Sequence, residues 1–168
     1  SYGSGSFEVA NILQFHHVDY LAVAYSDEGV ELRKAGITLP IMVMNPEVMN
    51  FEMMMKYRLE PEIYNFRQLN QLAEVLKKHQ GESFRIHLKL DTGMHRLGFE
   101  EREINELVVR LNNNKHLHIQ SVFSHLAGSD EAEHDGFTKL QVDRFKKMSD
   151  EILSNFNYPI MRHILNSS

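Results

Sequence analysis

Strand-length apolar runs alternate along this chain with segments of helical period, and each pair takes roughly 25 to 30 residues. Six runs read as strands, at 20–24, 41–44, 60–64, 84–90, 116–124 and 162–165, of which 60–64 is the weakest. This rhythm is typical of βα units that build a parallel sheet. It therefore predicts an α/β fold.

The segments between these runs carry apolar residues three and four positions apart, as an amphipathic helix does. Ser26 can cap a helix that Gly36 ends, and Asn65 can cap a helix that continues to about residue 79. Other helices are predicted at about 7–16, 47–57, 104–111 and 137–156. A helix thus precedes or follows each predicted strand.

Short turns and the lack of a distinct second half favour a (β/α)8 barrel of the TIM type over a doubly wound sheet. Six strands make only part of such a barrel, so we expect one partial barrel domain over residues 1–168. The chain starts without Met and stops just after an apolar run. We therefore expect it to be truncated at both ends, with a neighbouring strand missing from each.

Composition excludes several classes of function. The 168 residues, 42% of them hydrophobic, suffice for one domain with a sizeable core. A net charge of −5 without a basic run argues against nucleic acid as the partner. The absence of cysteine excludes thiol chemistry, and no run approaches the roughly 20 apolar residues of a membrane span. We expect a cytoplasmic protein with a small-molecule partner and no metal.

Chemistry in such a fold belongs on the loops that follow the strands. The loops after the last three predicted strands hold short polar motifs, and a further one stands at the start of the chain. The motifs are Lys89-x-Asp91-Thr92-Gly93-Met94-x-Arg96-Leu97-Gly98, Ser124-His125-x-Ala127, His163-x-x-Asn166-Ser167 and Tyr2-Gly3. Hydroxyl and amide groups at a strand end, beside free backbone N–H groups, can hold a phosphate.

In order and spacing these motifs closely resemble those of the alanine racemases, which are pyridoxal-phosphate-dependent enzymes of fold-type III. The resemblance covers essentially the whole chain. It implies that the chain is a fragment of the N-terminal barrel domain of such an enzyme. It implies that Tyr2, Asn166 and Ser167 help to hold the phosphate of pyridoxal 5'-phosphate. It also implies that His125 lies against the pyridine ring or supports its contacts.

For catalysis, the resemblance implies that Arg96 binds the substrate carboxylate or steadies a second catalytic base. Lys89 matches a lysine that is often carbamylated in this family. Such an anion could pair with the guanidinium of Arg96 in a bidentate contact.

The implied reaction interconverts L-alanine and D-alanine through a pyridoxal phosphate aldimine, in a homodimer that supplies D-alanine for peptidoglycan. The family's Schiff-base lysine is expected just before Ser1, and its tyrosine base beyond Ser168 in a β-rich domain. We therefore expect this fragment alone to be inactive. His95 replaces the family's usual Gly, as in the racemase half of some bacterial ligase–racemase fusion proteins, and its side chain can alter the loop backbone.

Other interpretations of the same residues carry less weight. Asp91-Thr92-Gly93 is also the active-site triplet of aspartic proteases, but those folds are all-β. The ten histidines suggest a metal site, but His16-His17, His116-x-His118 and His134 lie on different predicted elements, and no His-x-x-x-His pair shares a helix face with an acid. The main alternative is a non-catalytic pyridoxal-phosphate carrier on the same barrel. Arg96 argues against it, because a carrier binds no substrate carboxylate.

Overall fold

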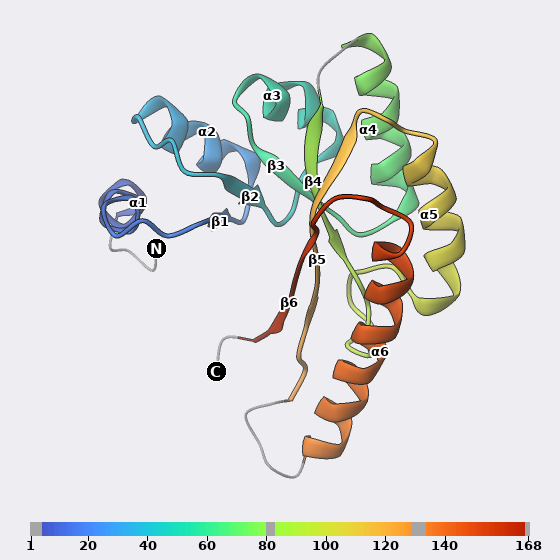
Figure 1. Ribbon diagram of the computed structural model, residues 1–168. Helices are drawn as coiled ribbons and strands as arrows, with labels where there is room; N and C mark the ends of the chain where they lie inside the picture. Colours follow the sequence, from blue (N-terminus) through green and yellow to red (C-terminus); the bar gives the residue numbers. More distant parts are fainter. Residues whose placement is uncertain (1–4, 80–82, 129–133, 167–168) are drawn as a thin grey trace. The chain divides into compact units, whose positions relative to one another are not determined.

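The structure is a computed structural model that describes residues 5–79, 83–128 and 134–166. It divides into two compact units, Ser1–Glu62 and Ile63–Ser168, which Figure 1 draws in blue to cyan and in green to red. Each unit holds parallel strands connected through helices.

In the first unit, β1 pairs with β2, and β2 pairs with β3, all in parallel. Leu21 is registered with Ile41, and Met42 with Glu60. The elements are α1 (Ser6–Phe15), β1 (Leu21–Val23), α2 (Ser26–Lys34), β2 (Ile41–Val43), the 3-10 helix η1 (Val48–Asn50), α3 (Phe51–Lys56) and β3 (Glu60–Ile63).

The start of α2 differs from the sequence expectation. Its N-cap is Tyr25, whose backbone N–H donates to the carboxylate of Glu28 at 3.1 Å, so the predicted Ser26 cap is wrong. The Ser26 hydroxyl instead accepts a 3.0 Å hydrogen bond from the side-chain amide of Asn50. Gly36 follows the end of the helix with a φ of 94°, as predicted for a residue in that position.

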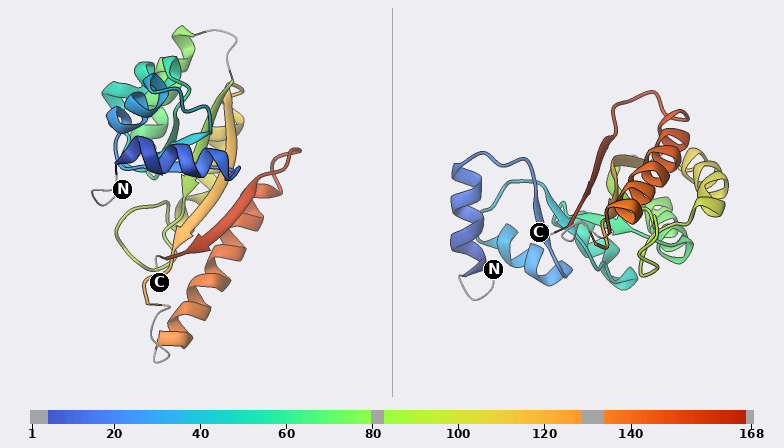
Figure 2. Two further views of the ribbon diagram at one scale, coloured as in Figure 1. Left: turned by 90° about the vertical axis from the view of Figure 1, so that its left-hand side faces the viewer. Right: turned by 90° about the horizontal axis from the view of Figure 1, so that it is seen from below.

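In the second unit, β4 pairs with β5, and β5 pairs with β6, again in parallel. The elements are α4 (Phe66–Lys78), β4 (Phe84–Lys89), the 3-10 helix η2 (Glu101–Glu103), α5 (Ile104–Asn112), β5 (Leu117–His125), α6 (Asp135–Leu153) and β6 (Met161–Leu165). In Figures 1 and 2 the helices α4, α5 and α6 lie on the same side of these strands.

The helix α4 forms as the sequence predicts. The side-chain oxygen of Asn65 accepts the backbone N–H of Gln68 at 2.9 Å and caps the helix. Leu69, Leu72 and Leu76 then bury one face of the helix.

The expected class, α/β with parallel strands as in a partial (β/α)8 barrel, is confirmed. No described helix combines the length and the apolar character needed to cross a membrane.

The strand β4 is buried on both of its faces. Every residue of Phe84–Lys89 except Arg85 is buried. Burial on both faces is usual for parallel strands. The buried polar residues His87 and Lys89 are therefore held inside the unit, and both belong to the face that carries the site.

Candidate active site

The three strands of the second unit have two chemically different faces. Successive side chains along a strand point to opposite faces of the sheet. Residues that are registered with each other on neighbouring strands point to the same face. His87 is registered with Ser121, Lys89 with Phe123, and Phe123 with His163. We call this set the polar face, defined by His87, Lys89, Ser121, Phe123, His125 and His163.

The opposite, helix face consists of Ile86, Leu88, Ile119, Val122, Ser124, Arg162 and Ile164. Arg162 identifies it, since its guanidinium donates to the hydroxyl of Ser149 at 3.4 Å and to the carboxylate of Asp150, both on α6. Ile86, Leu88 and Val122 are completely buried there. The helix α6 therefore packs against this face, and the polar face lies on the other side of the strands.

A β-bulge in β5 determines which of its side chains lie on the polar face. Ile86 pairs with Ile119, whereas the next residue, His87, pairs with Ser121, so Gln120 has no registered partner on β4. The extra residue moves everything after it on β5 to the other face. Without the bulge, Ser121, Phe123 and His125 would face the helices.

The loop after β4 is a closed structure that presents Arg96. The backbone N–H of Asp91 donates to the carbonyl of Phe99 at 2.9 Å, and the N–H of Phe99 donates to the carbonyl of Lys89 at 2.9 Å. Gly98 has a φ of 134°, and a Cβ atom there would lie 2.5 Å from the backbone nitrogen of Asp91. Only glycine fits this crossing of the chain.

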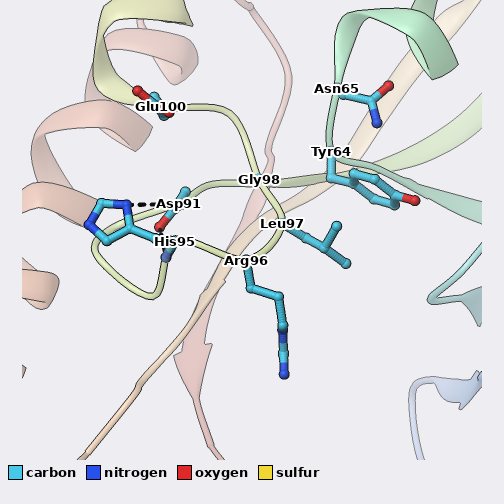
Figure 3. A pocket seen from close by; sticks show the side chains of 8 residues that line it. All are labelled: Tyr64, Asn65, Asp91, His95, Arg96, Leu97, Gly98 and Glu100. Carbon is cyan, nitrogen blue, oxygen red and sulfur yellow. Dashed lines mark hydrogen bonds and ion pairs between the residues drawn. The ribbon is translucent and has the colours of Figure 1, made fainter.

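Within this loop His95 takes the place that the resemblance gives to glycine. Its φ of 54° lies in the left-handed region, which glycine adopts without strain and other residues at roughly 1–2 kcal/mol. The carboxylate of Asp91 accepts the backbone N–H groups of Gly93 at 2.9 Å and of His95 at 3.1 Å. Its other oxygen lies 3.6 Å from Nδ1 of the His95 ring, as Figure 3 shows. The side chain is thus accommodated in a conformation typical of glycine.

Buried hydroxyl groups connect this loop to the end of β5. The hydroxyl of Ser124 donates to the carbonyl of Leu90 at 2.7 Å, which leaves its oxygen to accept from Thr92 at 2.9 Å. Both hydroxyls are almost inaccessible to solvent. The loop that carries Arg96 is therefore fixed relative to the end of β5, which carries His125.

Gln141 on α6 completes this network and was missed by the sequence analysis. Its amide nitrogen donates to the carbonyl of His125 at 3.1 Å and to the hydroxyl of Thr92 at 3.3 Å. Its amide oxygen accepts the backbone N–H of Ala127 at 3.0 Å. The available signal was its spacing, since Gln141 shares the buried stripe of α6 with Phe145 and later apolar residues.

Two predicted cations, Arg96 and Lys89, act on His125 at the carboxyl edge of β4 and β5. Burial lowers the pKa of His125 below its ordinary value, and the positive charges of Arg96 and Lys89 lower it further. Lys89 is 6% exposed, and its Nζ lies 5.5 Å from the centre of the Phe123 ring. The edge is thus electropositive, and His125 is held neutral at pH 7.

Asn166 lies at the same edge. It follows Leu165, which is registered with His125 and accepts the backbone N–H of Leu126 at 3.1 Å. The other two predicted residues, Tyr2 and Ser167, fall outside the described residues. The second unit therefore brings together Lys89, Arg96, His125 and Asn166.

A neighbouring cavity of about 290 Å³ includes only Arg96 from the predicted set. In Figure 3 the Arg96 side chain extends away from His95 and Glu100, so these groups do not converge on one point. The cavity is lined by Tyr64, Asn65, Asp91, His95, Arg96, Leu97, Gly98 and Glu100. Among residues 5–79, 83–128 and 134–166, no three acidic or histidine side chains gather as a metal site would require.

Comparison with known proteins identifies the scaffold. The family model described as "Alanine racemase, N-terminal domain" matches residues 1–168. The chain belongs to the alanine racemase family. The alanine racemase of Clostridium tetani is 34% identical over 171 residues, covering 100% of this chain and 43% of that protein. That of Thermodesulfovibrio yellowstonii is 36% identical over 169 residues, covering 99% and 44%.

Solved structures agree with this assignment to the alanine racemase family. The alanine racemase of Clostridium difficile 630 superposes with a TM-score of 0.89 at 35% identity, covering 99% of this chain and 46% of that one. The Bacillus anthracis enzyme, solved with bound L-Ala-P, gives 0.84 at 28% identity, covering 99% and 43%. The chain thus spans less than half the length of the relatives it matches.

Proposed function

We propose that the protein containing this chain is an alanine racemase that interconverts L-alanine and D-alanine with pyridoxal 5'-phosphate. The observation that carries the proposal is the edge where His125, at the end of β5, lies close enough to Arg96 and Lys89 for both positive charges to lower its pKa. Membership of the alanine racemase family supports it independently.

The residues at this edge fit the cofactor. Its phosphate and the substrate carboxylate are both anions, and cationic or amide side chains at the ends of parallel strands suit anions. Asn166 would donate its amide to the phosphate, together with Tyr2 and Ser167. Pyridoxal phosphate, when bound, supplies an electron sink that makes the Cα proton of alanine removable.

Arg96 would hold the substrate carboxylate. A guanidinium group binds a carboxylate through two parallel hydrogen bonds and so orients it as well as attracting it. The loop that carries Arg96 is closed at its base and contains two strongly constrained glycines. Such a rigid support limits the number of orientations in which the substrate binds.

Lys89 and His125 would set the electrostatics beside the substrate. The buried Lys89 side chain stabilises nearby negative charge, or pairs with Arg96 when carbamylated. His125 is neutral near pH 7, because burial and two neighbouring cations oppose its protonation. It would therefore act through hydrogen bonds and contact with the pyridine ring.

For the complete protein we propose a homodimer that works in the cytoplasm and supplies D-alanine for peptidoglycan. Family membership and the resemblance of the motifs support this part of the proposal. The relation to ligase–racemase fusion proteins is part of the same proposal.

The decisive experiment uses the protein made from the complete reading frame that encodes this chain. With added pyridoxal phosphate it should form D-alanine from L-alanine, measured by chiral chromatography, and cofactor binding should be measured by equilibrium dialysis. Tight cofactor binding without any D-alanine would contradict the proposal and favour the carrier interpretation.

Arg96→Lys tests the role of the guanidinium. The turnover should fall about 100-fold while cofactor affinity changes much less, since a point charge does not orient a carboxylate as the planar fork does. Arg102→Lys is the matched control, because Arg102 is an exposed arginine nearby that pairs with Glu100. Equal loss of turnover and cofactor affinity would mean that Arg96 is structural.

A further inference from the structure

Three polar side chains form a line across the polar face. On β4 and β5 the line lies two residues before Lys89 and Phe123. Nδ1 of His87 lies 2.7 Å from the hydroxyl oxygen of Ser121, and that oxygen lies 3.4 Å from Nε2 of His163. Each residue comes from a different strand, and His87 and Ser121 are buried. None of the site residues proposed above belongs to this line.

We propose that His87 and Ser121 are positioning residues that hold His163 as a neutral imidazole with its proton on Nδ1. The Ser121 hydroxyl has a single proton and can donate to only one of the two rings. In this proposal Nδ1 of His87 carries a proton and donates to the Ser121 oxygen, so that the hydroxyl donates to Nε2 of His163. His163 must then carry its own proton on Nδ1.

The surroundings of His163 favour the neutral ring. Its ring stacks on Phe123 with centres 4.9 Å apart and planes 5° apart, while the Nζ atom of Lys89 lies over the same Phe123 ring. Burial lowers the pKa of His163, and neighbouring His87 lowers it further. A charged His163 would add a cation to a face that already holds Lys89.

Other ionisable groups near His163 lie along its own face or behind it. On the polar face the described ones are His87 and Lys89 of β4 and His125 at the end of β5. Arg162 and Asp150 pair with each other on the helix face. No carboxylate is registered beside His163 among the described residues of β4 and β5, so the polar face offers no counter-ion from those strands to a protonated ring.

The functional part of this inference rests on the proposed racemase activity. His163 lies three residues before Asn166 on β6 and faces the same side as His125. A neutral ring with its proton on Nδ1 can donate to an anionic group of cofactor or substrate without adding charge. His87 and Ser121 would thus determine how β6 meets the bound ligands.

The test uses the complete protein with ¹⁵N-labelled histidine rings, and His163→Gln assigns the His163 signals. At pH 7 the His163 nitrogens should show one neutral tautomer, protonated on Nδ1. In Ser121→Ala the two tautomers should interconvert, and kcat should fall about tenfold with KM nearly unchanged. Ser121→Thr keeps a hydroxyl and should restore both the tautomer and kcat.

Ser149→Ala is the control, because it removes an equally buried hydroxyl on α6 that bonds to the carbonyl of Lys146 and to Arg162 on the helix face. It should leave the His163 signals unchanged. A charged His163 at pH 7, the opposite tautomer, or a pattern unaffected by Ser121→Ala would overturn the inference. A single Nδ1 tautomer in a protein without racemase activity would support the inference while overturning the proposed function.

Discussion

Adjacent residues on the same strands of the second unit do different work on the two faces. On the helix face Leu88 and Val122 are wholly buried among apolar groups, so their contribution is burial of apolar area. On the polar face Lys89 and Phe123, one position along each strand, place a cation over an aromatic ring. One face mainly stabilises the fold, and the other keeps polar groups where a ligand can use them.

Polar groups are tolerated inside the unit because they are hydrogen-bonded. Buried polar atoms without partners cost about 1–3 kcal/mol each. His87 and Ser121 contact each other, and Thr92, Ser124 and Gln141 form a second connected set. The comparison predicts that substitutions on the helix face act on stability, whereas those on the polar face act on binding and turnover.

The largest effect on stability is expected for Leu88→Ala. Truncating a completely buried leucine should lower the free energy of unfolding by about 2–5 kcal/mol, since it loses apolar burial and leaves a cavity. Urea denaturation measures this change, with the exposed Val109→Ala on α5 as the control, expected to stay within about 0.5 kcal/mol. A loss below about 1 kcal/mol for Leu88→Ala would break the distinction between the faces.

Lys89→Met should have the opposite profile. Met fills a similar volume, so the free energy of unfolding should change by less than about 1 kcal/mol. Turnover should fall about 100-fold if the proposed function is right, because the change removes a charge from a buried position at the proposed substrate site. Steady-state kinetics and urea denaturation of the same preparation test both halves. A stability loss comparable with that of Leu88→Ala would show that Lys89 mainly supports the fold.

Gln141→Leu should affect both properties, since Gln141 lies on α6 but bonds to the backbone of His125. It leaves the carbonyl of His125 and the N–H of Ala127 without these partners, which should cost about 2 kcal/mol. Cofactor affinity should fall as the loop after β5 loosens. Gln71→Leu, on the exposed surface of α4, is the matched control. An unchanged cofactor affinity would separate the network from the site.

The smallest effect is a pH dependence that comes from the polar face. The pKa values of His125 and His163 are lowered in the folded state, mainly by burial. Below the ordinary histidine pKa of about 6.5 the unfolded chain therefore binds more protons than the folded one. The free energy of unfolding should fall as the pH drops from 7 through this range. The double variant His125→Gln with His163→Gln should show a flatter profile, and an equal slope would contradict the origin of the effect.

The sequence already located most secondary structure, because apolar spacing and caps are local properties. Asn65 accepts the bond expected of a cap, and Gly36 ends α2 in a left-handed conformation. The order of the motifs also placed Arg96 and His125 after neighbouring strands, and parallel strands bring their carboxyl ends to one edge. Ser26 was misassigned, because its hydroxyl bonds to Asn50, which is distant in sequence.

What the sequence by itself determined is the α/β rhythm, the family and the residues at the strand ends. Only the tertiary structure decided which way the side chains of β5 face, because one unpaired residue, Gln120, shifts the register without any signal in the local pattern. The tertiary structure also gave Gln141 its role and brought His87, Ser121 and His163 into line. These features depend on contacts between residues far apart in the chain, and a pattern along the sequence does not record such contacts.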